Sequence, residues 1–324
     1  HKYDPITSKD YYEFASNFTR TVRAYVEHDP DARTYEFIKS QWALDSQKLV
    51  RQLERYGETT LEKPFQEWLE TGPYEIPLDR WVVLAPDTFS SKDGSTLEKL
   101  WDDSVLVSGK NPDQESEILF FEAETGLQNI TALRMETLTH SSLSGNGPGR
   151  DHEGGFTIRD VSVDIKGLGT PNSKWEKVEL KSAEATSQEN AESLSARAAI
   201  NGISQGWSID LDGFGKDQAL VIRFTKPIGF EAGSRIKIRL TSGRNVQQMV
   251  GRPRFSITLD PKAPLEVSDG IPVFAYQGLL RLLVDNSPIR LTENEIDGLR
   301  EWYFQKSEGW VSRRNKWIDH ILAK

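Results

Sequence analysis

The glycine-rich segment 144–155 holds the densest group of side chains that could do chemistry. It places an arginine, two carboxylates and an imidazole in a row, at Arg150, Asp151, His152 and Glu153. Loops between strands commonly carry binding groups, so these four residues predict a site for a polar ligand. Because hard cations prefer several oxygen ligands, Asp151 and Glu153 are also candidate ligands for calcium.

A structural interpretation of the same segment stays open. In that interpretation Arg150 pairs with a nearby acid, and the glycines adopt the positive φ angles that other residues avoid. The segment leads into a strand and lacks the Lys-Ser/Thr ending of a P-loop, so it does not predict a phosphate site.

A second candidate group consists of Asn201 and Trp207. Asn201-Gly202 predicts a tight turn, and Trp207 follows a few residues later. Trp207 either fills the bottom of a sandwich core or stacks on a sugar ring as part of a binding site. The core interpretation is favoured, because large aromatic side chains are usually buried.

The sequence shows no recognisable catalytic set. Its five histidines form no H-E-x-x-H pattern, it has no G-x-S-x-G motif, and its carboxylates are too scattered to identify a glycosidase pair. It also has no cysteine, so it offers no disulfide, thiolate nucleophile or haem-attachment motif. We therefore expect a protein that is not an enzyme and has no cofactor of its own, calcium apart.

Composition limits the kinds of partner. The net charge of −9 over 324 residues argues against nucleic acid, because phosphate binding requires clustered Lys and Arg. No apolar run approaches the roughly 18 residues of a membrane span. The sequence begins at His1 without an initiator Met, as expected for a segment of a longer polypeptide.

Helical periodicity dominates the N-terminal part of the chain. Ser8 can cap a first helix, and a second helix fits residues 34–56, where apolar residues recur at helical spacing. Gly57 is expected to end that helix. A short further helix is expected around residues 65–69, closed by Gly72-Pro73.

The C-terminal part is also predicted to be helical. Prolines mark residues 261–272 as a linker, and the apolar run 273–283 predicts a helix. Thr292 and Glu295 form a capping box that begins another helix. Gly309 is expected to separate it from a last helix.

Between these ends the hydrophobic period changes from 3.6 to 2. The segment 235–240 alternates charged and apolar residues, which predicts an antiparallel sheet with one solvated face. Short strands with regular turns are typical of a β-sandwich. The predicted strands are 81–84, 96–100, 104–107, 117–121, 132–138, 156–165, 176–180, 219–224, 235–240 and 254–259.

The predicted fold is therefore mainly β with flanking α-helices: an antiparallel jelly-roll β-sandwich plus N- and C-terminal helical segments. The expected domains are a helical segment over 1–77, a β-sandwich binding module over 78–260 and a second helical segment over 261–324.

Several segments carry a resemblance to a known family. These segments are 80–84, 104–113, 130–136, 145–150 and 155–158. They resemble the module between the DUF1549 and DUF1553 domains of large planctomycete-type cytochrome-like proteins. In the same way, residues 1–12 resemble the end of DUF1549, and residues 291–303 resemble the stretch that leads into DUF1553.

The family resemblance implies an extracytoplasmic location, periplasmic or at the cell surface. It also implies a haem c in the parent protein only, upstream of His1. Residues 199–207 resemble a turn of discoidin-like, galactose-binding-type sandwiches, although Asn201 stands where that turn usually has Asp.

Three hypotheses of function follow. The first is a non-catalytic binding module whose partner is carbohydrate or a neighbouring domain of the same polypeptide. The second is a structural spacer that docks a haem-bearing domain against its neighbour, with the flanking helices packed together. The third is a polysaccharide-active enzyme, which requires two carboxylates that converge in a cleft. An aromatic side chain lying flat on a groove favours sugar binding, whereas buried Trp81 and Trp207 favour the spacer.

Overall fold

A computed structural model describes residues 32–76, 81–111, 117–169, 172–202, 205–243, 247–285, 288 and 291–322. The helix expected from Ser8 and the segment 1–12 lie outside these residues. The chain divides into two compact units at Lys48/Leu49. The described part of the first unit is the N-terminal portion of helix α2 (Ala32–Tyr56), and everything below concerns the second unit.

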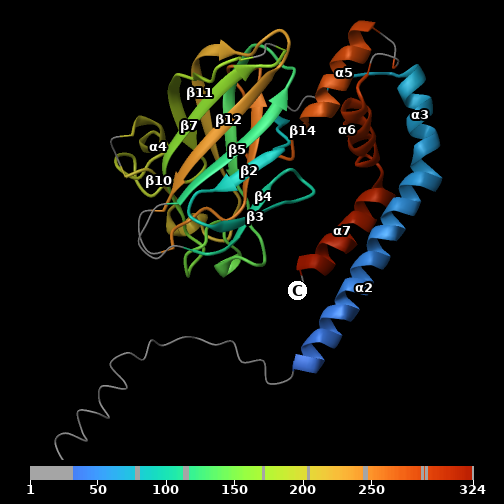
Figure 1. Cartoon of the computed structure of the whole chain (residues 1–324), viewed down its shortest axis with the longest axis horizontal. Coiled ribbons are helices and arrows are strands. Elements are labelled where there is room, and N and C mark those ends of the chain that lie inside the picture. The colour runs from blue at the N-terminus through green and yellow to red at the C-terminus, as the bar shows by residue number, and fades with distance from the viewer. Residues whose placement is uncertain are drawn as a thin grey trace, which may run out of the picture. The chain divides into compact units, whose positions relative to one another are not determined.

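The strands form a β-sandwich, as predicted (Figure 1). The first sheet has the order β14-β1-β13-β6-β11-β9 and the second has the order β10-β7-β12-β5-β2, with β8 beside β7 and a separate β3-β4 hairpin. All pairings are antiparallel except that of β1 with β14. The strands are β1 (Val82–Val83), β2 (Thr88–Ser91), β3 (Ser95–Lys99), β4 (Val105–Gly109), β5 (Glu117–Thr125), β6 (Ile130–Thr137), β7 (Thr157–Gly167), β8 (Glu176–Lys177), β9 (Leu180–Ala185), β10 (Trp207–Ser208), β11 (Gln218–Ile228), β12 (Ser234–Ser242), β13 (Pro253–Thr258) and β14 (Ile271–Pro272).

Alternating side chains build the core between the sheets. In β12 every second residue is buried, so Ile236, Ile238 and Leu240 face the interior and the charged residues between them face outward. The predicted solvated face of this strand is therefore confirmed. The core is shared between both sheets, with Leu133 and Phe255 from the first meeting residues of the second.

The helix that includes residues 49–56 does not end at Gly57. It continues through a π-helical turn, η1 (Gly57–Leu61), into α3 (Glu62–Thr71), so the predicted termination at Gly57 is wrong. A Cβ on Gly57 would lie 2.9 Å from the rings of both Phe304 and Trp310. Glycine is thus needed here for a close approach between helices rather than for a chain turn.

The C-terminal helices are α5 (Val273–Asp285), α6 (Glu293–Phe304) and α7 (Glu308–Leu322). The predicted capping box at the start of α6 is confirmed: Thr292 Oγ1 accepts the N–H of Glu295, whose carboxylate accepts the N–H of Thr292. The predicted last helix is separate from α6, but the break lies at residues 305–307 and Gly309 lies inside α7. A Cβ at Gly309 would lie 2.3 Å from the hydroxyl of Tyr56, so this glycine too permits close packing.

A second hydrophobic core joins helices from both ends of the sequence. Phe65 and Leu69 of α3 pack with Leu279 of α5 and with Leu299 and Phe304 of α6. Figure 1 shows these helices grouped together beside β14. The flanking helical segments therefore pack together over these residues, as the spacer hypothesis expects. None of the helices among the described residues has the length and apolar character needed to span a lipid bilayer.

Candidate functional site

The glycine-rich loop is shaped by hydrogen bonds within itself. Asp151 is buried, and its Oδ1 accepts the N–H groups of Glu153 at 2.9 Å and Gly155 at 2.7 Å. A Cβ on Gly149 would lie 1.9 Å from the carbonyl oxygen of Gly155, so the two arms of the loop touch. One oxygen of the candidate calcium ligand Asp151 is therefore already occupied by the backbone.

Arg150 holds the neighbouring β3-β4 hairpin in place. Its guanidinium donates to the carbonyl oxygens of Gly109 at 2.8 Å and Lys110 at 3.1 Å, and to the hydroxyl of Ser95 at 3.1 Å. Burial lowers the pKa of Arg150, and the carboxylate of Glu117 counteracts that effect. Arg150 therefore binds its own chain, as the structural interpretation expects, but these partners are carbonyl and hydroxyl oxygens rather than the predicted acid.

The remaining loop candidates point outward. The side chains of His152 and Glu153 are 85% and 60% exposed, and His152 Nε2 lies 3.7 Å from Glu153 Oε1. Within the part of the chain that the structure describes, no three His, Asp, Glu or Cys side chains gather as metal ligands would. The calcium site stays a prediction without a ligand cluster to support it.

Trp207 belongs to the core. It is fully buried, its indole N–H donates to the carbonyl of Ser187 at 2.7 Å, and its ring meets that of Phe156 edge to face at 4.9 Å. The favoured core interpretation is confirmed. Phe156 directly follows the loop, so this contact, which is closed to solvent, connects Trp207 to the end of the loop.

Asn201 does not form the predicted tight turn. It is the last residue of a short helix, α4 (Ala198–Asn201), and Gly202 ends that helix in the left-handed conformation with φ of 64°. Asn201 is exposed. The Asn-Gly pair is thus a helix end, where glycine is the usual residue because it has no Cβ to strain.

Residues 260–270, called here the strap, cross the outer face of the first sheet. The sequence predicts a linker here, but Ala263 is buried with Trp81, Ala132 and Val221 in a small cluster of its own. The indole N–H of Trp81 donates to the carbonyl of Pro264 at 3.1 Å. The strap is therefore part of the folded structure, and the simple linker interpretation is wrong.

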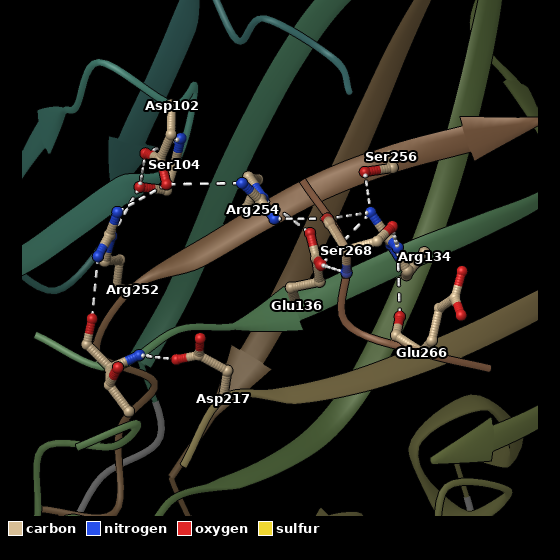
Figure 2. A network of polar contacts seen from close by, with 11 residues as sticks. Asp102, Ser104, Arg134, Glu136, Asp217, Arg252, Arg254, Ser256, Glu266 and Ser268 are labelled. Carbon is tan, nitrogen blue, oxygen red and sulfur yellow. Dashed lines mark hydrogen bonds and ion pairs between the residues drawn. The ribbon is translucent and has the colours of Figure 1, made fainter. Parts of the chain in front are cut away.

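Three arginines, called here the arginine clamp, bind the backbone of the strap. Arg223 of β11 donates to the carbonyls of Pro261 at 2.7 Å and Ala263 at 3.1 Å. Arg134 of β6 donates to the carbonyl of Glu266 at 3.2 Å, and Arg134 and Arg254 of β13 both reach the carbonyl of Ser268, at 3.0 and 2.8 Å. Figure 2 shows Arg134 and Arg254 converging on Ser268.

A buried carboxylate holds two arginines of the clamp in position. Glu136 is fully buried, 3.3 Å from Nη2 of Arg134 and 2.7 Å from Nε of Arg254 (Figure 2). Burial alone lowers the pKa of Arg254, but the hydrogen bond to Glu136 and the charges of Glu136 and Asp102 raise it above its ordinary value. The network extends to Asp102, whose Oδ2 lies 2.6 Å from Nη2 of Arg252.

The sequence alone does not predict this network, for a physical reason. Arg134, Glu136 and Arg254 occupy alternate positions of their strands, where charged residues normally indicate a solvated face. Nothing local to those strands signals that the strap covers them. The only hint in the sequence is that β6 and β13 carry arginines opposite an apolar face, and this pattern does not reveal a covering segment.

The outer face of the second sheet carries a different charge arrangement. Arg235 of β12 pairs with Glu122 at 2.9 Å and Glu124 at 2.8 Å on β5, and also with Asp87. Lys237 lies 3.1 Å from Glu122. These side chains are partly exposed and bind one another, whereas the clamp binds a covering segment.

Comparison of the chain with protein-family models and with curated proteins finds no match.

Proposed function

We propose that this protein is a non-catalytic structural spacer. It holds the helices of the second hydrophobic core, called here the helical core, and neighbouring domains of the same polypeptide in a fixed relation to the sandwich. The observation that carries the proposal is the arginine clamp, because it fastens the backbone that leads from the sandwich to α5. A flexible connection needs no such fixation, and burying charged groups costs free energy unless each is paired.

Further contacts support rigid coupling. The strap continues into β14, which pairs with β1, and then directly into α5. Gln277 of α5 donates to Thr125 Oγ1 at 3.2 Å, and the guanidinium of Arg314 lies 4.8 Å from the ring centre of Trp101. The helical core is thus attached to the sandwich at three separate places.

The tryptophans point the same way. Trp81 and Trp207 are both fully buried, so neither is a platform for a sugar ring. The family resemblance adds two parts to the proposal: an extracytoplasmic location and a haem-bearing neighbour. Carbohydrate binding through the glycine-rich loop is less well supported, because Arg150 and Asp151 bind their own chain.

Pulsed electron resonance between two spin labels tests the coupling. The chain has no cysteine, so labels attach only at introduced ones, for which exposed Glu184 of β9 and exposed Asn294 of α6 are suitable (E184C with N294C). We expect one narrow distance distribution, because the strap fixes sandwich and helices to each other. The additional change Arg223→Met should broaden it.

A matched control is Arg239→Met, on the open face of the second sheet, which should leave the distribution narrow. A broad distribution in the otherwise unchanged chain would contradict the proposal, as would equal broadening by both arginine changes.

A further inference from the structure

An open groove runs along the outer side of the sandwich, next to β7. Its volume is about 730 Å³, and it is lined by residues of β7, β8, β9, β11, β12 and α4. Small-ligand sites typically have volumes of roughly 300–1,000 Å³, so the groove is large enough for several linked rings. It lies away from the glycine-rich loop and from the clamp, and none of the residues discussed above as candidates lines it.

The lining has two kinds of surface. Leu180 and Ile200 contribute apolar, half-buried side chains. Carboxylates and cations stand beside them: Asp160, Asp164, Glu179, Lys177 and Arg239, together with the hydroxyls of Ser162 and Thr225. A ligand that fits must therefore offer an apolar face together with both hydrogen-bond donors and acceptors.

Part of the polar lining is fixed in advance. Nη1 of Arg239 lies 3.1 Å from Oδ2 of Asp160, with each side chain about one-third exposed. This pair presents donors and acceptors side by side. The ion pair holds both side chains in position before a ligand binds. Preorganised groups reduce the ordering cost of binding.

Charge decides the class of ligand. The lining holds three carboxylates and two cations, and Arg239 is already paired with Asp160. Of the two lysines beside the groove, Lys237 is paired with Glu122, so an anionic ligand gains no net attraction to set against the loss of its own hydration. A wholly apolar ligand would leave these charged groups without water or partners, which is costly. An uncharged polyhydroxylated ligand avoids both penalties, because its hydroxyls donate to carboxylates and accept from Lys and Arg.

An aromatic side chain stands next to the groove. Trp175 is half-buried, with the ammonium groups of Lys237 and Lys166 at 4.0 and 4.6 Å from its ring centre. Lys237 is the register partner of Asp164, which lines the groove. Trp175 is thus connected through Lys237 to Asp164 at the groove, although it is not itself part of the lining.

We propose that this groove binds an uncharged oligosaccharide, with the apolar faces of the sugar rings on Leu180 and Ile200 and the hydroxyls on the charged rim. The proposal does not depend on the spacer function, because the groove shares no residue with the strap or the clamp. Its occupant is a chain of pyranose rings, whose polar edges and apolar faces match the two surfaces of the lining.

Titration calorimetry on the whole 324-residue chain tests it, with hexasaccharides of β-linked glucose, xylose and mannose as probes and oligogalacturonate as the charged comparison. At least one neutral hexasaccharide should bind, and oligogalacturonate should bind more weakly. The change Ser162→Trp fills the groove floor and should weaken binding by about tenfold or more, the loss expected for one good contact.

Two variants serve as matched controls. Ser162→Ala removes only a hydroxyl and should keep most of the affinity, and Glu184→Gln, on β9 and outside the groove lining, should leave it unchanged. If Ser162→Trp does not fold, as judged by circular dichroism, Lys177→Trp on the exposed strand β8 replaces it. The proposal is overturned if no neutral hexasaccharide binds at about 10 mM, weaker than most specific sites, if oligogalacturonate binds best, or if binding survives the filling variant.

Discussion

The two outer faces of the sandwich carry the same residue types, but these residues bind different partners on each face. On the first sheet, Arg134, Glu136 and Arg254 are buried under the strap and bind its backbone. On the second sheet, Arg235 and Glu122 pair with each other in partial contact with solvent, with 16% and 20% of their side chains exposed. The difference lies in what covers each face rather than in the strands themselves.

This comparison shows that a covering segment changes how much an ion pair contributes to the stability of the fold. An exposed ion pair contributes little, because water solvates either partner well without the other. A buried group depends on every partner it has, because no water replaces one that is lost. The first face should therefore be sensitive to single substitutions and the second tolerant of them.

Loss of the buried carboxylate is expected to have the largest effect. Glu136→Gln leaves Arg134 and Arg254 buried without their shared counter-charge, and breaking a buried pair in this way typically costs about 3–5 kcal/mol. Urea unfolding followed by circular dichroism measures the change in free energy of unfolding. A loss below about 1 kcal/mol, the range of surface pairs, would mean that the two faces do not differ.

Glu122→Gln is the matched control on the open face, since Glu122 also contacts two cations, Arg235 and Lys237. It should cost about 1 kcal/mol or less. Salt sharpens the contrast: at about 1 M ionic strength exposed charges are screened within roughly 3 Å. The cost of Glu122→Gln should then decrease, and that of Glu136→Gln should change less.

A smaller contrast is expected between two arginines. Arg223→Met removes the donors to Pro261 and Ala263, and should lower stability by about 1–3 kcal/mol, as for hydrogen bonds to charged groups. Amide hydrogen exchange in the strap should accelerate. Arg239→Met breaks one pair whose side chains are about one-third exposed, and should cost less than about 1 kcal/mol, with strap exchange unchanged. Equal exchange in both variants would show that the clamp does not hold the strap.

The sequence was a good guide to elements whose signals are local. The alternation of residues 235–240 predicted β12 and its wet face, and the Thr292–Glu295 capping box predicted the start of α6. Both rest on interactions within a few residues of one strand or helix. The cover over Arg134 and Arg254 could not be predicted in this way, because it comes from a segment more than a hundred residues from Arg134.

Two glycines show the same limit. Gly57 and Gly309 predicted helix ends, yet both lie within helical structure, where Phe304, Trp310 and Tyr56 approach too closely for a Cβ. Sequence identifies a glycine but not whether a turn or a neighbouring ring requires it. The glycine-rich loop is similar: its sequence does not show that Arg150 binds the carbonyl oxygens of Gly109 and Lys110, which lie some forty residues earlier in the chain.

The smallest expected effect is a difference in how the two faces respond to acid. Burial and the nearby charge of Arg252, at the end of the buried network, lower the pKa of His140 below its ordinary value of 6.5. Its Nδ1 accepts the N–H of Ser142 at 3.2 Å, a bond that favours the neutral ring. The unfolded chain therefore binds this proton more readily, so stability should fall as the pH drops below 6.5.

On the open face the response begins at lower pH. Burial raises the pKa of Glu122, but its bonds to Arg235 and Lys237 outweigh that effect and hold the pKa below the ordinary 4.5. The stability that Glu122 contributes is present above 4.5 and is lost only as the pH falls further. Urea midpoints across this range should show that His140→Gln removes a loss between 6.5 and 4.5, whereas Glu122→Gln changes only the loss below 4.5. If His140→Gln leaves the upper part of the profile unchanged, the ring is not held neutral beside the buried network.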